Sequence, residues 1–85
     1  MPSNAMPTWS ESVSQLTTTI TFADFTEAFA FVTRVALEAQ ARNHHPDIAI
    51  SWNKVTLALS THDAGSTVTV KDRELAAAID SFVAG

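Results

Sequence analysis

The amino-acid sequence predicts an α+β domain, in which helices pack on one face of an antiparallel β-sheet of about four strands. Residues 16–22 alternate apolar side chains with threonine, the pattern of a half-buried strand. Residues 24–42 and 73–83 carry apolar side chains at helical spacing. Between these two segments, two short apolar runs flank a turn and indicate a hairpin. The order of strand, long helix, hairpin and short helix is typical of a sheet with its helices on one side.

A polar, proline-bearing segment opens the chain. We interpret residues 1–7 as a disordered lead-in or the remnant of an expression tag, and residues 8–85 as a single domain. Residues 9–13 are expected to form a short partner strand for residues 16–22. In the longer strand, one face is predicted to consist of Leu16, Thr18, Ile20 and Phe22.

The long helix is expected to begin at Asp24, because Asp24 and Glu27 have the spacing of a capping pair. Pro46 bars its continuation and biases His45 to extended geometry. Burying one phenylalanine contributes roughly 1.5–3 kcal/mol, so a domain this small depends on packing this helix against the sheet. The predicted apolar stripe consists of Phe25, Ala28, Phe29, Val32, Val35, Ala36 and Ala39, and Phe31 is also assigned to the core.

The register of the hairpin decides which distant side chains meet. We predict a two-residue turn at Asn53-Lys54 and pair Trp52 with Val55, which puts the large apolar residues, Trp52 included, on one face. The same register, extended outward, brings His45 opposite His62, with His44 beside them. All three histidines of the chain are therefore expected at the open end of the hairpin.

The last third of the chain contains a turn and a helix. Residues 63–67 are rich in turn formers, and residues 68–70 are expected to add a short extended segment. Asp72 is expected to cap the final helix. The side chains predicted to face the core from this helix are Leu75, Ala76, Ile79, Phe82 and Val83.

Composition excludes several classes of partner. The formal net charge is −4, the pI is about 5.0 and no Lys/Arg cluster occurs, so nucleic acid is not expected as a direct partner. No apolar run approaches the roughly 20 residues that span a bilayer, and no signal peptide is evident, so we expect a cytoplasmic protein without membrane contact. The absence of cysteine removes disulfides and thiolate metal ligands.

Four motifs, in a fixed order over residues 9–84, point to a known family. They are Phe22-Ala23-Asp24-Phe25, His44-His45-Pro46-Asp47, Trp52-Asn53-Lys54-Val55 and Thr61-His62-Asp63. Together they resemble pterin carbinolamine dehydratase. The resemblance implies dehydration of 4a-hydroxytetrahydropterin to quinonoid dihydropterin and water, in tetrahydrobiopterin recycling, with a reduced pterin as substrate and with neither a metal nor a cofactor.

The resemblance also implies which residues act. His44 and His62 are expected to be the acid and the base, with His45 binding and orienting the substrate. The chemistry suits histidine, because one proton must reach the departing hydroxyl and another must leave the neighbouring ring nitrogen, and imidazole has a pKa of about 6.5. The residues implied in substrate binding are Trp9, Pro46, Thr61 and Asp72. Two of them have a purely structural alternative, since Trp9 suits packing and Asp72 suits a helix cap.

The chain departs from the family pattern at three places. Gln40 stands where members commonly carry a glutamate. The segment Gly65-Ser66-Thr67 replaces the usual Gly-Gly turn and adds one residue before Asp72. The family's leading helix is expected to be absent, because no room is left for it ahead of Trp9.

Two other functions stay open. The first is a catalytically weak relative that acts as a protein-binding or dimerisation module, or as a transcriptional coactivator, as the family resemblance allows. The small-residue sheet face of Ala49, Ser51, Thr56 and Ala58 suits the close approach of another subunit, so a homodimer or homotetramer is expected. The second is zinc binding by the three histidines with an open position for water, which no cysteine supports.

Overall fold

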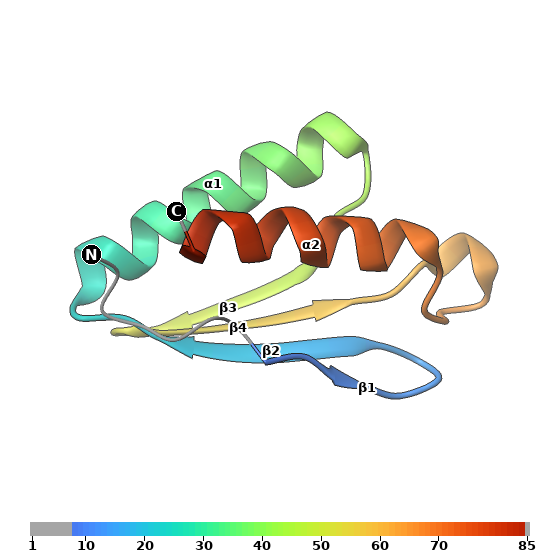
Figure 1. Ribbon diagram of the computed structural model, residues 1–85, viewed down its shortest axis with the longest axis horizontal. Coiled ribbons are helices and arrows are strands. Elements are labelled where there is room, and N and C mark those ends of the chain that lie inside the picture. The colour runs from blue at the N-terminus through green and yellow to red at the C-terminus, as the bar shows by residue number, and fades with distance from the viewer. Residues whose placement is uncertain (1–7, 85) are drawn as a thin grey trace.

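Two helices cover one face of a four-stranded antiparallel sheet, which confirms the predicted α+β class (Figure 1). The structure is a computed structural model that describes residues 8–84, so the predicted lead-in at residues 1–7 lies outside the described residues. In chain order, the elements are β1 (Ser10–Glu11), β2 (Leu16–Thr21), α1 (Phe25–Arg42), β3 (Asp47–Ser51), β4 (Lys54–Leu59), the short 3-10 helix η1 (His62–Ala64) and α2 (Val70–Ala84).

The strand order is β1-β2-β4-β3, so β2 and β4 occupy the middle of the sheet. Their antiparallel register pairs Thr18 with Leu57 and Ile20 with Val55. The predicted alternation in the first long strand is confirmed, because Leu16, Thr18, Ile20 and Phe22 are all buried. The core between the sheet and the helices is completed by Val55, Leu57 and Leu59 from β4, by Ala28, Phe31, Val35 and Ala39 from α1, and by Leu75, Ala76, Ile79 and Val83 from α2.

Helix α1 begins where the capping pair predicts. The Asp24 side chain accepts a hydrogen bond from the Glu27 amide at 2.8 Å, and the Glu27 carboxylate accepts one from the Ala23 amide at 3.1 Å. The predicted apolar stripe is partly wrong, because Phe25 and Phe29 are 49% and 53% exposed. Only one stripe of the helix contacts the sheet, and in it Phe31 packs against the ring of Phe22, while Phe25 and Phe29 stack on each other outside the core.

The predicted hairpin register is wrong by two residues. The ladder pairs Ile48 with Leu57 and Ser51 with Lys54, and the turn lies at Trp52-Asn53 instead of Asn53-Lys54. A shift of two residues keeps every side chain on its predicted face, so the apolar pattern cannot distinguish the two registers. Asn53 distinguishes them, because its carbonyl accepts from the Phe22 amide at 2.7 Å and its side-chain amide donates to the Phe22 carbonyl at 3.0 Å.

The corrected register changes the expected neighbours of two residues. Trp52 takes a positive φ of 53° in the turn and is 67% exposed, so its assignment to the core is wrong. The β3-β4 ladder ends at Asp47 and Ala58, and extending it outward would put His45 across from Ser60 instead of His62. The strand pairing therefore does not join the two histidine segments.

Helix α2 begins earlier than predicted. Val70 is its first residue, so residues 68–70 do not form the expected extended segment, and only an isolated bridge joins Thr61 to Thr67. The expected cap at Asp72 is also corrected. Thr69 precedes the helix and accepts from the Lys71 amide at 3.3 Å, while Asp72, in the first turn, accepts from the Thr69 amide at 2.8 Å.

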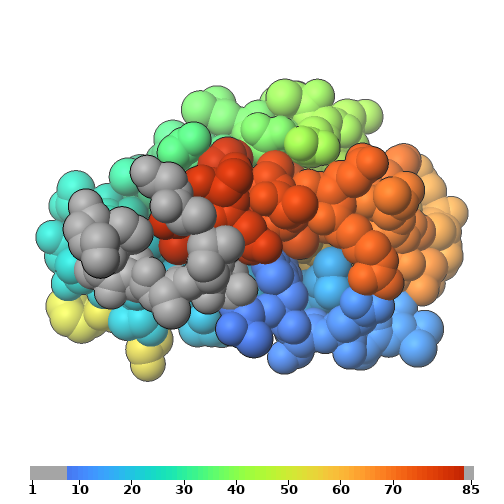
Figure 2. All heavy atoms as spheres, in the orientation of Figure 1, coloured from blue at the N-terminus to red at the C-terminus, as the bar shows by residue number. Residues whose placement is uncertain are grey.

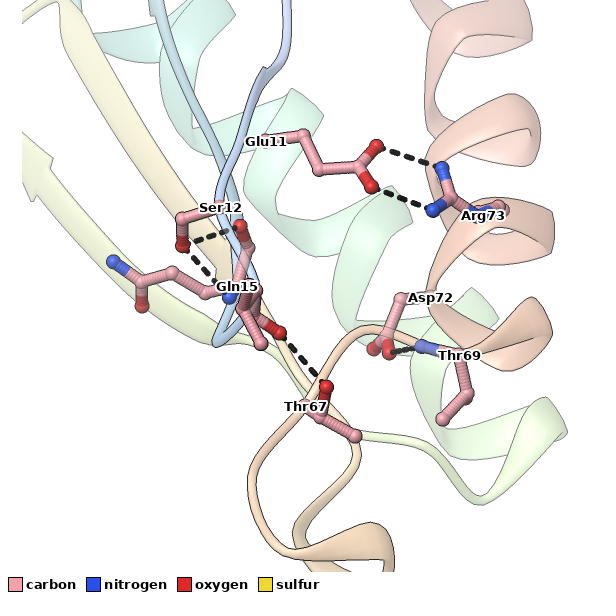
Figure 3. A network of polar contacts seen from close by, with 8 residues as sticks. Glu11, Ser12, Gln15, Thr67, Thr69, Asp72 and Arg73 are labelled. Atoms are coloured by element: carbon pink, nitrogen blue, oxygen red, sulfur yellow. Dashed lines mark hydrogen bonds and ion pairs between the residues drawn. The ribbon is translucent and has the colours of Figure 1, made fainter.

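In the view of Figure 2, α2 runs across the middle of the molecule, with the green α1 above it and the blue β1-β2 region below it. Arg73 of α2 donates to both carboxylate oxygens of Glu11 in β1, at 2.7 and 2.6 Å. These contacts attach the start of α2 to the edge of the sheet (Figure 3). No helix within residues 8–84 has the length and apolar character needed to cross a membrane.

Candidate active site

All three histidines line one cleft of about 170 Å³. The α1-β3 connection and the β4-α2 connection lie at the same end of the molecule (Figure 1). Both connections contribute residues to the lining of the cleft. The histidines thus meet through two connections that flank the hairpin, and not across its ladder. The complete lining consists of Asn43, His44, His45, Ser60, Thr61, His62, Asp63 and Lys71.

The end of α1 fixes the backbone that carries His44 and His45. Asn43 ends the helix in the left-handed conformation with a φ of 52°, a conformation that asparagine tolerates better than most residues. The next amide, that of His44, donates to the Ala39 carbonyl at 3.0 Å and closes the helix end. Pro46 follows between His45 and β3, and it does not line the cleft.

His44 is held by a buried carboxylate. Its Nε2 lies 2.6 Å from Oδ1 of Asp72, and the two side chains are 12% and 0% exposed. Asp72 also accepts from the Thr61 hydroxyl and from the Thr69 amide, each at 2.8 Å; Figure 3 shows the Asp72–Thr69 contact. The Thr61 hydroxyl has one hydrogen and donates it in the bond to Asp72. The contact of 2.6 Å between the Thr61 and Thr69 hydroxyls is therefore donated by Thr69. The carboxylate therefore ends a chain of hydrogen bonds that begins at Thr69, the residue that precedes α2.

These hydrogen bonds set the charge state of the carboxylate. Burial pushes the pKa of Asp72 upward, but hydrogen bonds from His44, from the Thr69 amide and from Thr61 outweigh burial and hold this pKa below its ordinary value. Asp72 is therefore an ionised acceptor behind His44 at neutral pH. It does not line the cleft itself.

The other two imidazoles have weaker, exposed partners. Nε2 of His45 lies 2.9 Å from the amide oxygen of Gln40, and Nδ1 of His62 lies 3.4 Å from the hydroxyl of Ser66. Each of the three imidazoles thus forms a hydrogen bond between one ring nitrogen and an oxygen of the protein. Within residues 8–84, the second ring nitrogen of each has no hydrogen-bond partner. Three unpartnered nitrogens at one cleft suit a ligand that exchanges protons.

The four residues predicted to bind substrate fall in different places. Thr61 lines the cleft, Asp72 stands behind His44, and Pro46 shapes the connection. Trp9 lies elsewhere, because its indole Nε1 donates to Asp80 at 2.8 Å and its ring packs against the core. Asp80 follows Asp72 by eight residues on α2, which is about 12 Å along a helix. In the single chain, Trp9 has the packing role that the sequence left open.

Sequence reasoning missed several residues of the site. Residue patterns alone indicate no role for Ser66 or Thr69 in the site, although the Thr69-x-x-Asp72 spacing is itself a capping signal. In the sequence Gln40 is only a departure from the family pattern, yet its amide oxygen lies 2.9 Å from Nε2 of His45. Asn43 and Ser60 directly precede the two histidine motifs in the sequence, whereas no sequence signal marks Lys71 as a residue of the cleft.

The zinc hypothesis finds no support in the arrangement of side chains. Among the residues that the structure describes, no group of three or more histidine, aspartate or glutamate side chains is placed to hold a metal ion. The three imidazoles share a cleft without forming such a group.

Comparisons of the sequence find one family. The model of the family described as pterin 4 alpha carbinolamine dehydratase matches residues 2–82. A protein of Rhodospirillum rubrum named "Putative pterin-4-alpha-carbinolamine dehydratase" is 51% identical over 79 residues, covering 91% of this chain and 81% of the relative. A protein of the same name from Chloroflexus aurantiacus is 52% identical over 77 residues, covering 91% and 82%.

Comparisons of the structure find the same fold. A crystal structure described as a transcriptional coactivator/pterin dehydratase from Brucella melitensis has a TM-score of 0.80 and 28% identity, covering 94% of this chain and 84% of that one. A pterin dehydratase-like protein described as a RuBisCO assembly factor in the alpha-carboxysome has a TM-score of 0.73, with coverage of 93% and 90%. Its identity of 18% makes the likeness one of fold alone.

Proposed function

Because this chain belongs to the pterin 4 alpha carbinolamine dehydratase family, we propose that it dehydrates 4a-hydroxytetrahydropterin to quinonoid dihydropterin by histidine acid–base catalysis. In this proposal the reaction forms part of tetrahydrobiopterin recycling in the cytoplasm. One observation carries it: His44, His45 and His62 line one cleft, and each keeps one ring nitrogen without a partner in the described part of the chain.

Two proton transfers account for the reaction. The bond between the ring carbon and its hydroxyl breaks, and the hydroxyl takes up a proton and departs as water. The neighbouring ring nitrogen loses its proton, and the electron pair of that N–H bond forms the new carbon–nitrogen double bond. Atoms and electrons balance without an oxidant or a reductant, so no step of the proposed mechanism calls for a cofactor. Positioned general acid–base catalysis contributes about 10²- to 10⁴-fold in rate.

Their surroundings support different roles for His44 and His62 in this proposal. Ionised Asp72 accepts a hydrogen bond from the Nε2–H of His44, which leaves the Nδ1 lone pair available to take a proton. We therefore propose His44 as the base that deprotonates the ring nitrogen. Exposed His62 is proposed as the acid, because it can regain its proton from solvent after each turnover. His45, held by Gln40, is proposed to orient the substrate.

The size of the cleft limits how the substrate is held. Its volume of about 170 Å³ lies below the roughly 300–1,000 Å³ of pockets that enclose drug-sized ligands. In the proposal, the cleft of one chain takes the reacting edge of the two-ring heterocycle, and the side chain of the pterin extends outward. Thr61 lines the cleft, Pro46 shapes the connection beside it, and Trp9 packs against the core.

A direct assay tests this proposal. The rate at which chemically generated 4a-hydroxytetrahydropterin disappears is followed by absorbance with and without the protein. We expect acceleration by the wild type and loss of about 10²- to 10⁴-fold of that activity in His62→Ala. Ser81→Ala is a matched control, because the Ser81 hydroxyl only donates to the Ala78 carbonyl of its own helix. If the wild-type protein leaves the spontaneous rate of dehydration unchanged, the proposed dehydratase activity is excluded.

A second proposed function is protein binding, including self-association into a homodimer or homotetramer. Phe25, Phe29 and Leu37 on α1 are 49%, 53% and 68% exposed, which is unusual for large apolar side chains in so small a domain. The Brucella melitensis relative is described as both coactivator and dehydratase. Sedimentation of the wild type and of Leu37→Glu tests this proposal, because a charge at the interface would dissociate the oligomer. A wild type that sediments as a monomer at micromolar concentration would contradict it.

A further inference from the structure

Ser66 has a backbone conformation that serine rarely adopts. Its φ is 56°, in the left-handed region, and the only other non-glycine residues with positive φ among residues 8–84 are Asn43 and Trp52. Asparagine accommodates this region, whereas serine is strained there because its Cβ crowds the backbone. Strained residues persist where the surrounding structure holds them, and they concentrate at functional sites. Ser66 therefore calls for an explanation from its surroundings.

Several hydrogen bonds hold the loop that carries Ser66. The Thr61 amide donates to the Thr67 carbonyl at 2.9 Å, and the Ser66 amide donates to the Thr61 carbonyl at 3.1 Å. The Thr67 hydroxyl and the Val68 amide both donate to the Val13 carbonyl, at 2.8 and 3.2 Å. Figure 3 shows Thr67 reaching the turn between β1 and β2. The base of the loop is thus closed on itself and attached to the sheet, which fixes Ser66 in its strained conformation.

The contact that this conformation produces is with His62. The Ser66 hydroxyl lies 3.4 Å from Nδ1 of His62, and neither side chain has another hydrogen-bond partner in the described part of the chain. This contact therefore engages Nδ1 and leaves Nε2 for a ligand in the cleft. A glycine at position 66 would relieve the strain but would have no hydroxyl to offer. The hydroxyl is the property that distinguishes Ser66 from the residue its backbone favours.

We propose that Ser66 is a positioning residue for His62: its strained backbone aims the hydroxyl at Nδ1, which orients the imidazole and directs Nε2 to the substrate. The inference rests on the proposed dehydratase function. It adds Ser66, at a position where the family resemblance implies a glycine turn. Ser66 touches neither the substrate nor the reacting atoms, and it acts only through His62.

Two substitutions separate the hydroxyl from the strain. Ser66→Ala removes the hydroxyl and keeps a strained Cβ, whereas Ser66→Gly removes both. We expect each variant to lower kcat by about three- to tenfold, the effect of losing one neutral hydrogen bond, with KM changed by less than about twofold. We expect Ser66→Gly to raise the melting temperature by roughly 4 °C, because glycine accepts the positive φ without strain. Ser81→Ala should change neither property.

A lower kcat together with a higher melting temperature in Ser66→Gly would not be expected from a merely structural role. If Ser66 only shaped the loop, the more stable Ser66→Gly would keep or exceed the wild-type kcat, and that result would overturn the proposal. A wild-type kcat in Ser66→Ala would overturn it as well. Equal losses of kcat in Ser66→Gly, which is expected to be stabilised, and in Ser66→Ala, which is not, would support the proposal. The two variants share only the missing hydroxyl.

A spectroscopic measurement decides the contact without reference to activity. Long-range ¹H–¹⁵N NMR of the ligand-free protein reports the tautomer of each imidazole, and we expect the Nδ1 shift of His62 to change in both Ser66 variants while the shifts of His44 stay constant. Unchanged His62 shifts would overturn the proposal. If the wild type proves inactive, the dehydratase function fails, and the NMR result still decides whether Ser66 positions His62.

Discussion

The two sides of the candidate site hold their histidines by different means. On one side, His44 is nearly buried and bound to a carboxylate that is itself fixed by Thr61 and the start of α2. On the other side, His62 is exposed on a short 3-10 turn and has a single long contact, to Ser66. A largely buried network of hydrogen bonds therefore fixes the first imidazole, whereas local loop geometry fixes the second. The first side should be costly to disrupt for both stability and activity, and the second for activity alone.

Substitution of the two histidines gives the largest expected effect. In the proposed mechanism His44→Gln and His62→Gln each lower kcat by about 10²- to 10⁴-fold. Only His44→Gln should also destabilise the fold, by about 1–3 kcal/mol, because it disturbs the partner of a fully buried carboxylate. His62→Gln should change stability by less than about 0.5 kcal/mol. Urea unfolding of both variants checks this difference, and equal destabilisation would contradict it.

Asp72→Asn sharpens the comparison from the side of the partner. The amide keeps the shape of the side chain but replaces one acceptor oxygen with a donor, so it cannot accept from His44, Thr61 and the Thr69 amide together. We expect a loss of about 1–3 kcal/mol in the free energy of unfolding. We also expect kcat to fall by about 10- to 100-fold, as when the residue that orients a functional histidine is removed. Thermal unfolding and the dehydration assay measure the two effects, and wild-type activity would contradict the assigned role.

Of the two sides of the site, the one that holds His44 should make the free energy of unfolding depend on pH, through Asp72. The pKa of Asp72 is below its ordinary value of about 3.9 in the folded protein, so below neutrality the unfolded chain binds more protons than the native one. The stabilisation is fully present above that ordinary value and is lost as the pH falls through the lowered folded pKa. Urea unfolding from pH 6 to pH 3 should therefore show a smaller decrease in Asp72→Asn than in the wild type. Parallel curves would show that Asp72 is not the responsible group.

The smallest effect is expected at Gln40, which holds the third imidazole by an exposed contact. Gln40→Ala removes a neutral hydrogen bond at 2.9 Å, so we expect KM to rise by about threefold with little change in kcat, because His45 is proposed to orient the substrate. Stability should change by less than about 0.5 kcal/mol, since Gln40 is exposed on α1. Initial-rate kinetics over a range of substrate concentrations separate KM from kcat, and a selective fall in kcat would instead place His45 in the chemical step.

Local patterns predicted the elements of the fold because their causes lie within a few residues. Asp24 and Glu27 mark the start of α1 through hydrogen bonds that span one turn. The alternation from Leu16 to Phe22 identifies the buried face of β2, since side chains on a strand alternate between its two faces. The His-His-Pro and Thr-His motifs likewise lie in, or next to, the two segments that line the cleft.

Errors arose where distant contacts choose between local alternatives. Two hairpin registers bury the same faces, and the link from Asn53 to Phe22, 31 residues away, selects one of them. Phe25 and Phe29 satisfy helical spacing as well as Phe31 does, but only Phe31 faces the sheet. The position of Trp9 follows from a hydrogen bond to Asp80, 71 residues later in the chain. None of these partners can be identified from local periodicity.

The sequence by itself determined the α+β class, the start of α1 with its local cap, and the three imidazoles, the type of acid–base group that the proposed reaction needs. Only the tertiary structure decided that they meet through the α1-β3 and β4-α2 connections, and that Asp72, Gln40 and Ser66 each engage one of their ring nitrogens. The physical reason is one of range. Propensities and caps act over a few residues, whereas the partner of an imidazole depends on how whole elements pack.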